Sequence, residues 1–404
     1  MNRVETQTQF FRDTWAEINL DHLYENVKNI RDHIPGDVKV FAVVKANAYG
    51  HGDVQTAFTA LSAGAHGLAV AFLDEAISLR RAGVTAPILV LGATRPKDVK
   101  IAADLDISLT TFHQEWLVEA ENQLSEGDRL NLHIKCDTGM GRIGVRSTEE
   151  LMAIEQYVQA HSQFKLEGIF THFATADELN DDYLDRQLAR FEYMLNQLES
   201  LPAYIHSSNS AATLRKTNTL FNAVRVGIAM YGLTPSQEMK PELPFPLKEV
   251  FSLHSRLIHT KELSAGEKVS YGATYETGEA EWIGTIPIGY ADGWLRKLQG
   301  QDVIVNGERV PIVGRVCMDQ CMIRLPGFLD MGTRVTLIGH HGEEAITMDE
   351  IADKLDTINY EIPCMITTRV PRIYMRNGEP TEVSNKLLAT GIHSQQENNR
   401  QLDE

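Results

Sequence analysis

Short apolar runs alternate with amphipathic segments over residues 38–232, and this alternation limits the possible folds more than any other feature. Such a pattern is typical of parallel strands joined by crossover helices. We find about eight apolar runs, the number that a closed (β/α)8 barrel needs. They are Val38–Lys45, Ala65–Ala71, Pro87–Gly92, Ile107–Phe112, Leu130–Lys135, Leu166–His172, Ala203–Asn209 and Ala223–Tyr231. An open doubly wound sheet is the alternative, but the number of runs favours a barrel.

Helix-like segments lie between these runs. In Leu73–Ala82 the apolar residues recur at helical spacing, Thr148 opens a second segment, and Leu184–Leu201 is a third. A parallel α/β architecture is therefore expected over this part of the chain.

The pattern changes after Tyr231, where four prolines between residues 235 and 246 mark a linker-like stretch. Within the region that follows, Asn306-Gly307 suits the positive φ angles of a type I′ turn and predicts a hairpin. One helix is expected at Met348–Leu355. The runs that predict strands are Phe251–Lys261, Trp282–Tyr290, Asp302–Val313, Met322–Leu325 and Arg334–Ile338.

A chain of 404 residues is long enough for two domains. We expect a (β/α)8 TIM-like barrel at residues 18–244, followed by a mainly-β C-terminal domain at residues 245–385. Thr14–Ile18 alternates like a strand, so residues 1–17 are expected to pack with the β domain. Residues 386–404 end in a polar stretch, which we expect to be disordered.

The composition argues against two classes of partner. A net charge of −17 disfavours nucleic acid and anionic membranes, because their phosphates would be repelled. No stretch approaches the ~20 apolar residues of a membrane span, and the polar N-terminus has no signal core. The four cysteines have neither disulfide-framework nor zinc spacing. We therefore expect a soluble cytoplasmic protein with reduced thiols and no metal.

Lys45 ends the first apolar run and precedes a glycine-rich turn through Gly50 and Gly52. Partial burial at the mouth of a sheet lowers a lysine pKa from about 10.4 and favours the neutral amine, which forms a Schiff base with an aldehyde. An ordinary solvated lysine at the end of a strand is the alternative for this residue taken alone.

Other polar residues follow the ends of later runs, and barrel enzymes place their active sites at this rim. The arginines also fit structural ion pairs, and the histidine also fits a hydrogen-bonded core position. Their shared rim favours a functional site. The residues are Lys135, Asp137, Arg142, His172, Asn209, Ser210 and Arg225.

Two features of this rim suggest a phosphate site. Ser210 directly precedes a helix-like segment, and Gly227-Ile228 follow Arg225 at the last run, where barrels often hold phosphate. A simple N-cap serine is the alternative for Ser210. A reactive lysine that faces a phosphate site points to pyridoxal 5'-phosphate (PLP), which needs both.

The chain resembles the bacterial alanine racemases, which are PLP-dependent barrel enzymes, from Trp15 to about Tyr374. This resemblance implies interconversion of L- and D-alanine, which supplies D-alanine for peptidoglycan. The motifs that carry it are Ala42–Gly52, Lys135–Gly144, Val269–Gly272, Gly289–Gly293 and Gly314–Gln320.

The resemblance also implies how PLP is held. Lys45 would bind it covalently, and Arg225 would face the pyridine nitrogen. A guanidinium stays protonated and only donates, so that nitrogen would remain unprotonated and the ring would be a weaker electron sink. The phosphate would be held by Tyr49, Ser210, the amides of Gly227 and Ile228, and Tyr360.

Racemisation needs two acid–base groups, one on each face of the substrate carbon. The resemblance assigns Lys45 to the D-isomer and Tyr271 to the L-isomer. A free tyrosine has a pKa of about 10, so its phenolate needs support, and His172 bonded to Arg225 matches the family's support.

Further residues take substrate-binding roles by the same resemblance. Arg142 and the backbone of Met318 would bind the substrate carboxylate, and Lys135 matches a position that some members carbamylate to orient this arginine. Tyr271, Tyr290 and Met318 lie in the β domain and in this family reach the cofactor of a partner subunit. We therefore expect a head-to-tail homodimer with shared sites.

Three alternatives stay open at this point. A serine or broad-specificity racemase would use the same chemistry, and residues near Tyr290 and Tyr360 would decide between them. A barrel-type amino-acid decarboxylase typically has an acidic partner for the ring nitrogen, which Arg225 is not. A non-catalytic PLP carrier would need no β domain.

Overall fold

The computed structural model describes residues 10–389, which form two compact units. Within this range the barrel unit holds residues 22–48 and 52–248, and the β unit holds residues 10–21, 49–51 and 249–389. The chain thus passes between the units after residues 21 and 248, where the sequence predicts changes at 17 and 244. Of the tail that we expected to be disordered, residues 386–389 are instead helical, and residues 390–404 lie outside the described residues.

Eight parallel strands of the barrel unit close into a ring, because the last strand, β9, pairs with the first, β2. The paired residues run from Lys39↔Ala223 to Ala42↔Val226. The predicted (β/α)8 barrel is confirmed, and the open-sheet alternative is wrong. The strands are β2 (Lys39–Val43), β3 (Gly67–Val70), β4 (Ile88–Val90), β5 (Ser108–Thr111), β6 (Leu130–Lys135), β7 (Phe164–Phe170), β8 (Tyr204–His206) and β9 (Ala223–Val226).

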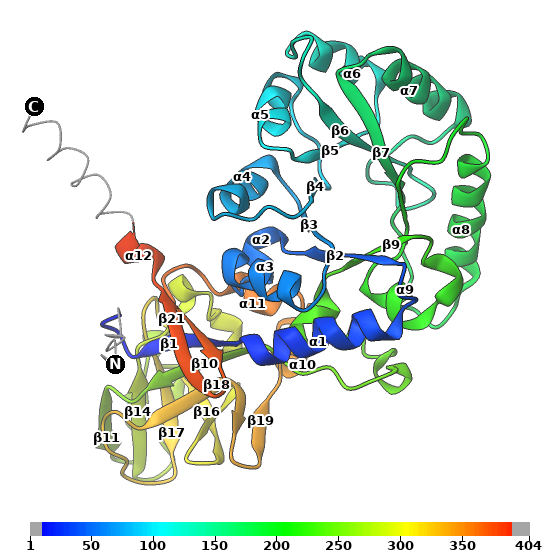
Figure 1. Cartoon of the computed structure of the whole chain (residues 1–404). Helices are drawn as coiled ribbons and strands as arrows, with labels where there is room; N and C mark the ends of the chain where they lie inside the picture. The colour runs from blue at the N-terminus through cyan, green and yellow to red at the C-terminus, as the bar shows by residue number, and fades with distance from the viewer. Residues whose placement is uncertain (1–9, 390–404) are drawn as a thin grey trace, which may run out of the picture. The chain divides into compact units, whose positions relative to one another are not determined.

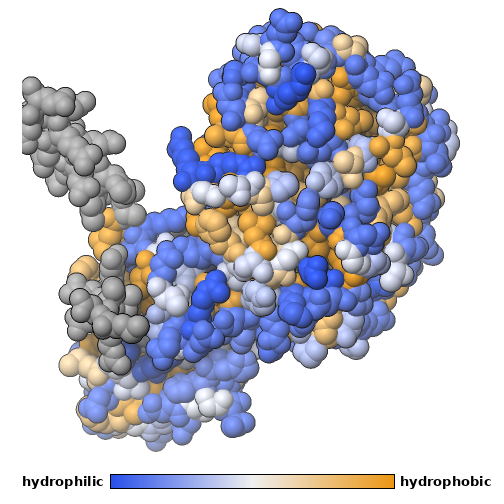
Figure 2. Space-filling view, viewed as in Figure 1, coloured by the Kyte–Doolittle hydropathy of each residue, from blue (hydrophilic) through white to orange (hydrophobic). Residues whose placement is uncertain are grey.

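Helices cover the outside of these strands (Figure 1). In α8 (Asp182–Leu195) the buried residues include Leu184, Leu188, Phe191 and Leu195, a spacing that places them on one face of the helix. The exposed face of the helix is mainly polar, and Figure 2 shows hydrophilic residues interspersed with hydrophobic patches on the one side of the molecule that it presents. The remaining helices are α1 (Leu20–His33), α3 (Asp53–Ser62), α4 (Leu73–Arg81), α5 (Val99–Asp104), α6 (Gln114–Glu121), α7 (Thr148–Ala160) and α9 (Ser210–Arg215), with the left-handed turn α2 (Lys45–Tyr49) and short 3-10 turns η1 (Pro96–Asp98), η2 (Thr217–Thr219), η3 (Ile228–Tyr231) and η4 (Lys240–Glu242).

The β unit is built on a long sheet in the order β11-β14-β17-β16-β15-β18-β10-β1-β20-β21, with β19 paired to β18. A separate two-stranded ribbon joins β12 (Lys268–Val269) and β13 (Tyr275–Glu276). The strands of the main sheet are β1 (Thr14–Asn19), β10 (Phe251–Arg256), β11 (His259–Leu263), β14 (Glu281–Ile286), β15 (Asp302–Val305), β16 (Glu308–Val313), β17 (Cys321–Leu325), β18 (Arg334–His341), β19 (Glu344–Ile346), β20 (Arg372–Arg376) and β21 (Glu379–Ser384).

Two local signals in the sequence explain parts of this sheet. Asn306 and Gly307 have φ of 51° and 83° and turn β15 into β16, as a type I′ hairpin requires. The early strand β1 pairs antiparallel with β10 and parallel with β20, so strands from both ends of the chain lie side by side (Figure 1).

The β unit contains three helices and several 3-10 turns. Helix α10 (Met348–Leu355) has the predicted bounds, and its N-cap Thr347 accepts a hydrogen bond from the backbone N–H of Glu350. The others are α11 (Glu361–Met365), α12 (Lys386–Ala389), η5 (Tyr271–Ala273), η6 (Tyr290–Asp292) and η7 (Arg296–Leu298). Between residues 10 and 389, no helix is long and apolar enough to cross a membrane.

Residues 49–51 belong to the β unit although they lie within the barrel sequence. A Cβ at Gly50 would lie 2.0 Å from the carbonyl oxygen of Pro363, so only glycine fits there. The carbonyl of Gly50 accepts a hydrogen bond from Arg372 Nε at 3.1 Å, and the His51 ring meets Phe251 edge-on. These contacts explain why the short segment packs with the β unit.

Candidate active site

Lys45 lies two residues after Val43, the last residue of β2, and is half-buried. The next residues, Ala46 to Tyr49, all have φ between 52° and 55°, which is the left-handed region. L-residues avoid this region at a cost of roughly 1–2 kcal/mol each. The chain therefore stops its strand abruptly at Lys45, at the end of a barrel strand where active sites form.

Glu75 stabilises this unusual turn. Its Oε1 accepts a hydrogen bond from the backbone N–H of Ala46 at 2.6 Å. Its Oε2 accepts from the N–H groups of Ala71 at 2.7 Å and Phe72 at 3.1 Å. Bonds from N–H groups to a carboxylate are stronger than neutral ones. One side chain thus ties the residue after Lys45 to the loop after β3. The sequence gives no signal for this role, since Glu75 looks like an ordinary acid in the first turn of α4.

Arg225 is buried inside the barrel on β9, with only 3% of its surface exposed. Its two terminal nitrogens donate to His206 Nδ1 at 2.7 Å and to His172 Nδ1 at 3.3 Å, and to three backbone carbonyls. Burial lowers the pKa of Arg225 to about 9, with repulsion from Arg142 adding to the effect. Among residues 10–389, its Nε makes no hydrogen bond.

His172 follows β7 and is held by Arg225. Because Arg225 only donates, the Nδ1 of His172 must accept, which leaves the proton of a neutral ring on Nε2. Burial lowers the pKa of His172 well below its ordinary value, and the nearby Arg225 and Lys135 lower it further. The ring is therefore neutral, and its Nε2–H is a donor.

Lys135 ends β6 and is almost fully buried. Its Nζ donates to the carbonyl of Cys136 at 3.1 Å and lies 5.2 Å from the centre of the Phe170 ring. Burial, followed by repulsion from Arg225, lowers the pKa of Lys135 to about 7. A sizeable fraction of this amine is therefore unprotonated near neutral pH.

Arg142 is exposed on the loop that follows β6. The buried carboxylate of Asp137 shapes this loop, because its Oδ1 accepts from the N–H groups of Gly139 at 3.2 Å and Gly141 at 2.8 Å. Gly144 has φ of 132°, and a Cβ there would lie 2.5 Å from the backbone nitrogen of Asp137. These contacts shape the loop that carries Arg142, whose charge acts on the buried Lys135 and Arg225.

Ser210 and the turn after β9 come together as the sequence predicts. The N-cap of α9 is Asn209, whose side chain accepts from the N–H of Ala212, so the alternative of Ser210 as the N-cap is wrong. Ser210 Oγ instead accepts from the N–H groups of Gly227 at 2.9 Å and Ala229 at 3.4 Å. Its own hydroxyl hydrogen remains available to donate. Ile228 begins η3 between these two residues.

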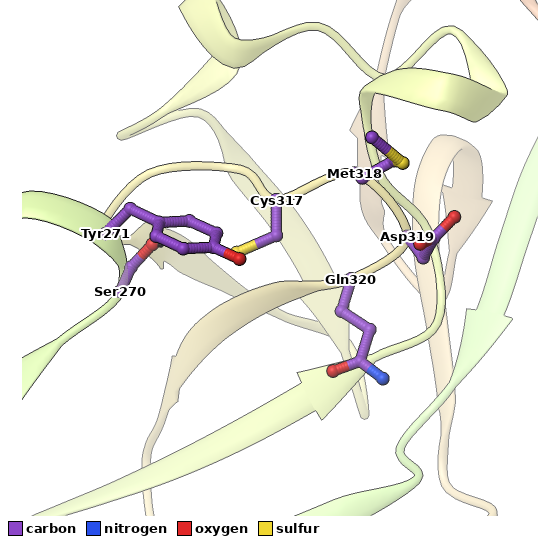
Figure 3. Close-up of a pocket in the computed structure, with 6 residues that line it drawn as sticks. All are labelled: Ser270, Tyr271, Cys317, Met318, Asp319 and Gln320. Carbon is purple, nitrogen blue, oxygen red and sulfur yellow. Dashed lines mark hydrogen bonds between the residues drawn. The ribbon is translucent and has the colours of Figure 1, made fainter.

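Tyr271, Met318 and Tyr290 lie on the β unit. Tyr271 is 69% exposed and Met318 is 53% exposed. Both line a hollow of about 450 Å³, in which the Tyr271 ring lies toward Cys317 while the Met318 side chain points elsewhere (Figure 3). Tyr290 is tied to the same loop, because its N–H donates to the carbonyl of Cys317 at 3.0 Å. The hollow is lined by Ser270, Tyr271, Cys317, Met318, Asp319 and Gln320.

Two further features hold this loop. The buried carboxylate of Asp292 pairs with Arg12 at 2.8 Å and accepts from the N–H of Gly289 at 3.0 Å. Ser270 has φ of 71°, and its hydroxyl donates to the carbonyl of Arg315 at 2.6 Å. Sequence reasoning missed both, since each depends on contacts between distant segments.

Tyr49 and Tyr360 also lie together on the β unit, with ring centres 6.3 Å apart. The predicted residues thus form two sets. The barrel unit holds Lys45, Lys135, Arg142, His172, Ser210, Arg225, Gly227 and Ile228, and the β unit holds Tyr49, Tyr271, Tyr290, Met318 and Tyr360. Between residues 10 and 389, no cluster of His, Cys, Asp or Glu side chains is arranged to hold a metal ion.

A closed barrel with a lysine at its mouth, joined to a mainly-β unit that carries an exposed tyrosine, defines the class of barrel-type amino-acid racemases. The family model of the alanine racemase N-terminal domain matches residues 18–235, and that of the C-terminal domain matches residues 250–374. The chain belongs to the alanine racemase family.

Individual relatives agree with this assignment. The alanine racemase of Geobacillus stearothermophilus is 59% identical over 378 residues, which cover 94% of this chain and 97% of the relative. The crystal structure of alanine racemase from Bacillus anthracis with bound L-Ala-P has a TM-score of 0.92 at 53% identity, covering 94% of this chain and 99% of that one. The histidine racemase of Leuconostoc mesenteroides has a TM-score of 0.86 at 34% identity, covering 90% and 98%.

Proposed function

We propose that this protein is an alanine racemase, which interconverts L- and D-alanine with the help of PLP and supplies D-alanine for peptidoglycan. The observation that carries this proposal is the 59% identity to an alanine racemase over nearly the whole chain. A racemisation assay with purified protein, PLP and each alanine isomer tests it. Failure of both isomers to convert would contradict it.

The residues of the barrel unit fit PLP by their donor chemistry. The Nε–H of Arg225, which has no acceptor among residues 10–389, suits a ring nitrogen that accepts. The hydroxyl of Ser210 and the N–H of Ile228 suit a phosphate, and the N–H of Gly227, which donates to Ser210 Oγ in this structure, would have to turn to the phosphate; Tyr49 and Tyr360 would be further donors. Lys45 would hold the aldehyde carbon. When bound, PLP supplies an electron-withdrawing ring that acidifies the substrate Cα–H.

The proton transfers would fall to two side chains of the protein. Lys45 takes or returns the Cα proton on the face used by D-alanine, and Tyr271 does so on the face used by L-alanine. Arg142 and the backbone N–H of Met318 bind the substrate carboxylate and fix the direction of the Cα–H bond. The neutral His172 can donate its Nε2–H to the Tyr271 oxygen, which favours the phenolate.

The ring nitrogen matters for the outcome of the reaction. Arg225 keeps its protons because its pKa of about 9 lies above neutral pH. It would therefore donate to the ring nitrogen of bound PLP without protonating it. A bound PLP ring held in this way would withdraw less charge from the substrate, which would limit side reactions such as transamination.

Each complete site would need two copies of the chain, with Tyr271, Tyr290 and Met318 contributed by the partner. The exposure of Tyr271 and Met318 supports this, because a general base and a substrate-binding loop work best where water is excluded. A closed two-fold dimer would shield both sites at once.

Mixing two inactive variants tests the shared site. In a mixed dimer of Lys45→Ala and Tyr271→Phe, one site would carry both lesions and the other would be intact. Random pairing should then restore about a quarter of the wild-type activity, since half of the dimers are mixed and half of their sites are intact. If each chain completes its own site, the mixture stays as inactive as its parents.

The substrate range is a second question, because a histidine racemase shares this fold at 34% identity. The fold therefore does not fix the substrate side chain, and a serine or broad-specificity racemase is the second candidate. A panel of L-amino acids at equal concentration separates them by the ratio of kcat/KM for each. Alanine should be converted with the highest kcat/KM.

A further inference from the structure

A chain of three hydrogen bonds runs through the barrel interior from Arg225 to Glu167. Arg225 donates to His206 Nδ1 at 2.7 Å, and His206 Nε2 lies 2.9 Å from His133 Nδ1. His133 Nε2 in turn lies 3.3 Å from Glu167 Oε2. Both histidines are essentially fully buried, and the Glu167 side chain is 15% exposed. Neither histidine nor Glu167 has a role in the function proposed above.

The two ends of this chain fix the positions of its protons. Arg225 can only donate, so His206 must accept at Nδ1 and carry its proton on Nε2. His206 then donates to His133 Nδ1, and His133 carries its proton on Nε2 and donates to Glu167. One arrangement of hydrogens satisfies all three bonds. In the opposite arrangement, an N–H of His206 would face the N–H of Arg225.

The charge state of each group agrees with this arrangement. Burial lowers the pKa of His206 well below its ordinary value and lowers that of His133 as well, so both rings are neutral. Although burial alone would raise it, the pKa of Glu167 is lowered to about 2 by hydrogen bonds from His133 and Ser108. Ser108 Oγ donates to Glu167 Oε2 at 2.6 Å. An ionised carboxylate therefore ends the chain.

The barrel makes room for these rings at a specific place. A Cβ at Gly168 would lie 2.3 Å from His133 Nδ1, although the backbone there would accept other residues. The β6–β7 register shifts between Leu132 and His133. Phe170 stacks on His206 with ring centres 4.8 Å apart, and Tyr204 stacks on His133 at 5.8 Å. The rings of His133 and His206 are therefore fixed in position by their neighbours.

We propose that Glu167 is a positioning residue for Arg225, acting through the fixed tautomers of His133 and His206. Through the two rings its carboxylate keeps His206 Nδ1 unprotonated, as an acceptor for one terminal nitrogen of Arg225, and so orients the guanidinium with Nε toward the PLP ring. This role rests on the function proposed above, because Nε needs a ligand to meet.

The direct test is the tautomer of each ring in the PLP-loaded enzyme. Solid-state ¹⁵N NMR of histidine-labelled protein distinguishes a protonated ring nitrogen from an unprotonated one, and the variants His206→Asn and His133→Asn assign the signals. In the wild type, Nδ1 of both rings should be unprotonated and Nε2 protonated. A protonated Nδ1 on His206 would overturn the proposal, whatever the enzyme's activity.

Variants at Glu167 test its role by the same ¹⁵N NMR measurement on PLP-loaded enzyme. Glu167→Gln keeps an acceptor for His133 and should retain the wild-type tautomers and most of kcat. Glu167→Leu removes the acceptor, so it should populate the Nδ1–H form of His206 and lower kcat about 10- to 100-fold, as loss of outer-shell partners does elsewhere. Unchanged tautomers in a folded Glu167→Leu would overturn the proposal. If Glu167→Leu does not fold, the ¹⁵N spectra of the wild type and of Glu167→Gln test the proposal instead, and a protonated Nδ1 on His206 in either protein would overturn it.

Lys165→Ala is the matched control, because Lys165 Nζ lies 3.6 Å from the other oxygen of Glu167 but outside the chain of bonds. It should leave tautomers and kcat unchanged. A charge effect without directional bonding would instead make Lys165→Ala and Glu167→Gln change kcat in opposite directions, and that result would overturn the proposal. Failure of the wild type to racemise alanine would count against the proposed function alone, because the NMR measurement of the tautomers does not depend on activity.

Discussion

Glu75 Oε1 accepts a hydrogen bond from the backbone N–H of Ala46 at 2.6 Å, and Ala46 is the residue that follows Lys45. The turn that begins at Ala46 is left-handed over four residues, none of them glycine. A conformation of this cost persists only when neighbouring groups stabilise it. The position of Lys45 therefore depends on a side chain that lies outside the site itself.

Glu75→Ala should destabilise the protein and slow the binding of PLP. Three backbone N–H groups lose their acceptor, which we expect to lower the free energy of unfolding by about 1–3 kcal/mol. Urea denaturation and the growth of visible absorbance after PLP is added to apoprotein measure the two effects. Asp74→Ala, an exposed acid on the same helical turn, should change neither.

Lys45→Ala should lose the visible absorption of bound PLP and racemise neither isomer of alanine, because no other amine is expected to bind the aldehyde. Absorbance of the dialysed holoprotein is the measurement. Lys39→Ala, at the exposed opposite end of the same strand, is the control and should keep both properties. A retained visible band in Lys45→Ala would refute the assignment.

Tyr271→Phe should slow proton removal from L-alanine far more than proton removal from D-alanine. Since the two isomers are equally stable, kcat/KM must fall equally in both directions, so the difference appears in isotope exchange. D-alanine should still exchange its α-proton with D2O through Lys45 without racemising, and L-alanine should not. Proton NMR of each isomer measures this. Tyr193→Phe, an exposed tyrosine on α8, should behave like the wild type, and equal loss of exchange from both isomers would contradict the two-base scheme.

The buried Lys135 should make stability depend on pH. Its pKa in the folded protein is about 7, below the ordinary value of about 10.5, so the unfolded chain binds the extra proton between these two values. Stability should therefore rise with pH across this window, by up to about 1.4 kcal/mol per unit from this group. The slope should disappear in Lys135→Gln when unfolding is measured from pH 7 to 10, and remain in Lys165→Gln.

An unprotonated amine of this kind can also react with carbon dioxide, and a carbamate on Lys135 would carry a negative charge toward Arg142. We expect a carbamate signal in ¹³C NMR of protein equilibrated with ¹³C-bicarbonate. The signal should be missing from Lys135→Gln and present in Lys165→Gln. A wild type without the signal would exclude the modification, and the stability slope above would then be at its largest.

Much of the fold could be predicted because its signals are local. Each barrel strand is a short apolar run, and the Asn306-Gly307 turn follows from two residues that tolerate positive φ. The sequence predicts one continuous strand over Phe251–Lys261, yet the structure divides it into β10 and β11. Its break falls at Leu257-Ile258, where both residues are apolar, so hydrophobicity gives no sign of the turn.

The candidate site was predicted mainly from resemblance, and its supports were not predicted at all. Glu75, Asp292 and the histidines of the barrel interior act through contacts between segments far apart in sequence. The assignment of residues 49–51 to the β unit has the same cause, since Pro363 and Arg372 hold them. Asn209 and Ser210 are adjacent candidates for one N-cap, and only the backbone geometry decides between them.

The place of β1 in the sheet sets an order on folding during synthesis. Its partners β10 and β20 begin at residues 251 and 372, so the first strand to leave the ribosome has no partner until the whole barrel has been made, and it gains its second partner only at residue 372. The eight barrel strands, all made in between, can meanwhile complete their ring. The β unit is thus closed last, by the two ends of the chain meeting, and a truncation near residue 372 would leave an assembled barrel with an unfinished sheet.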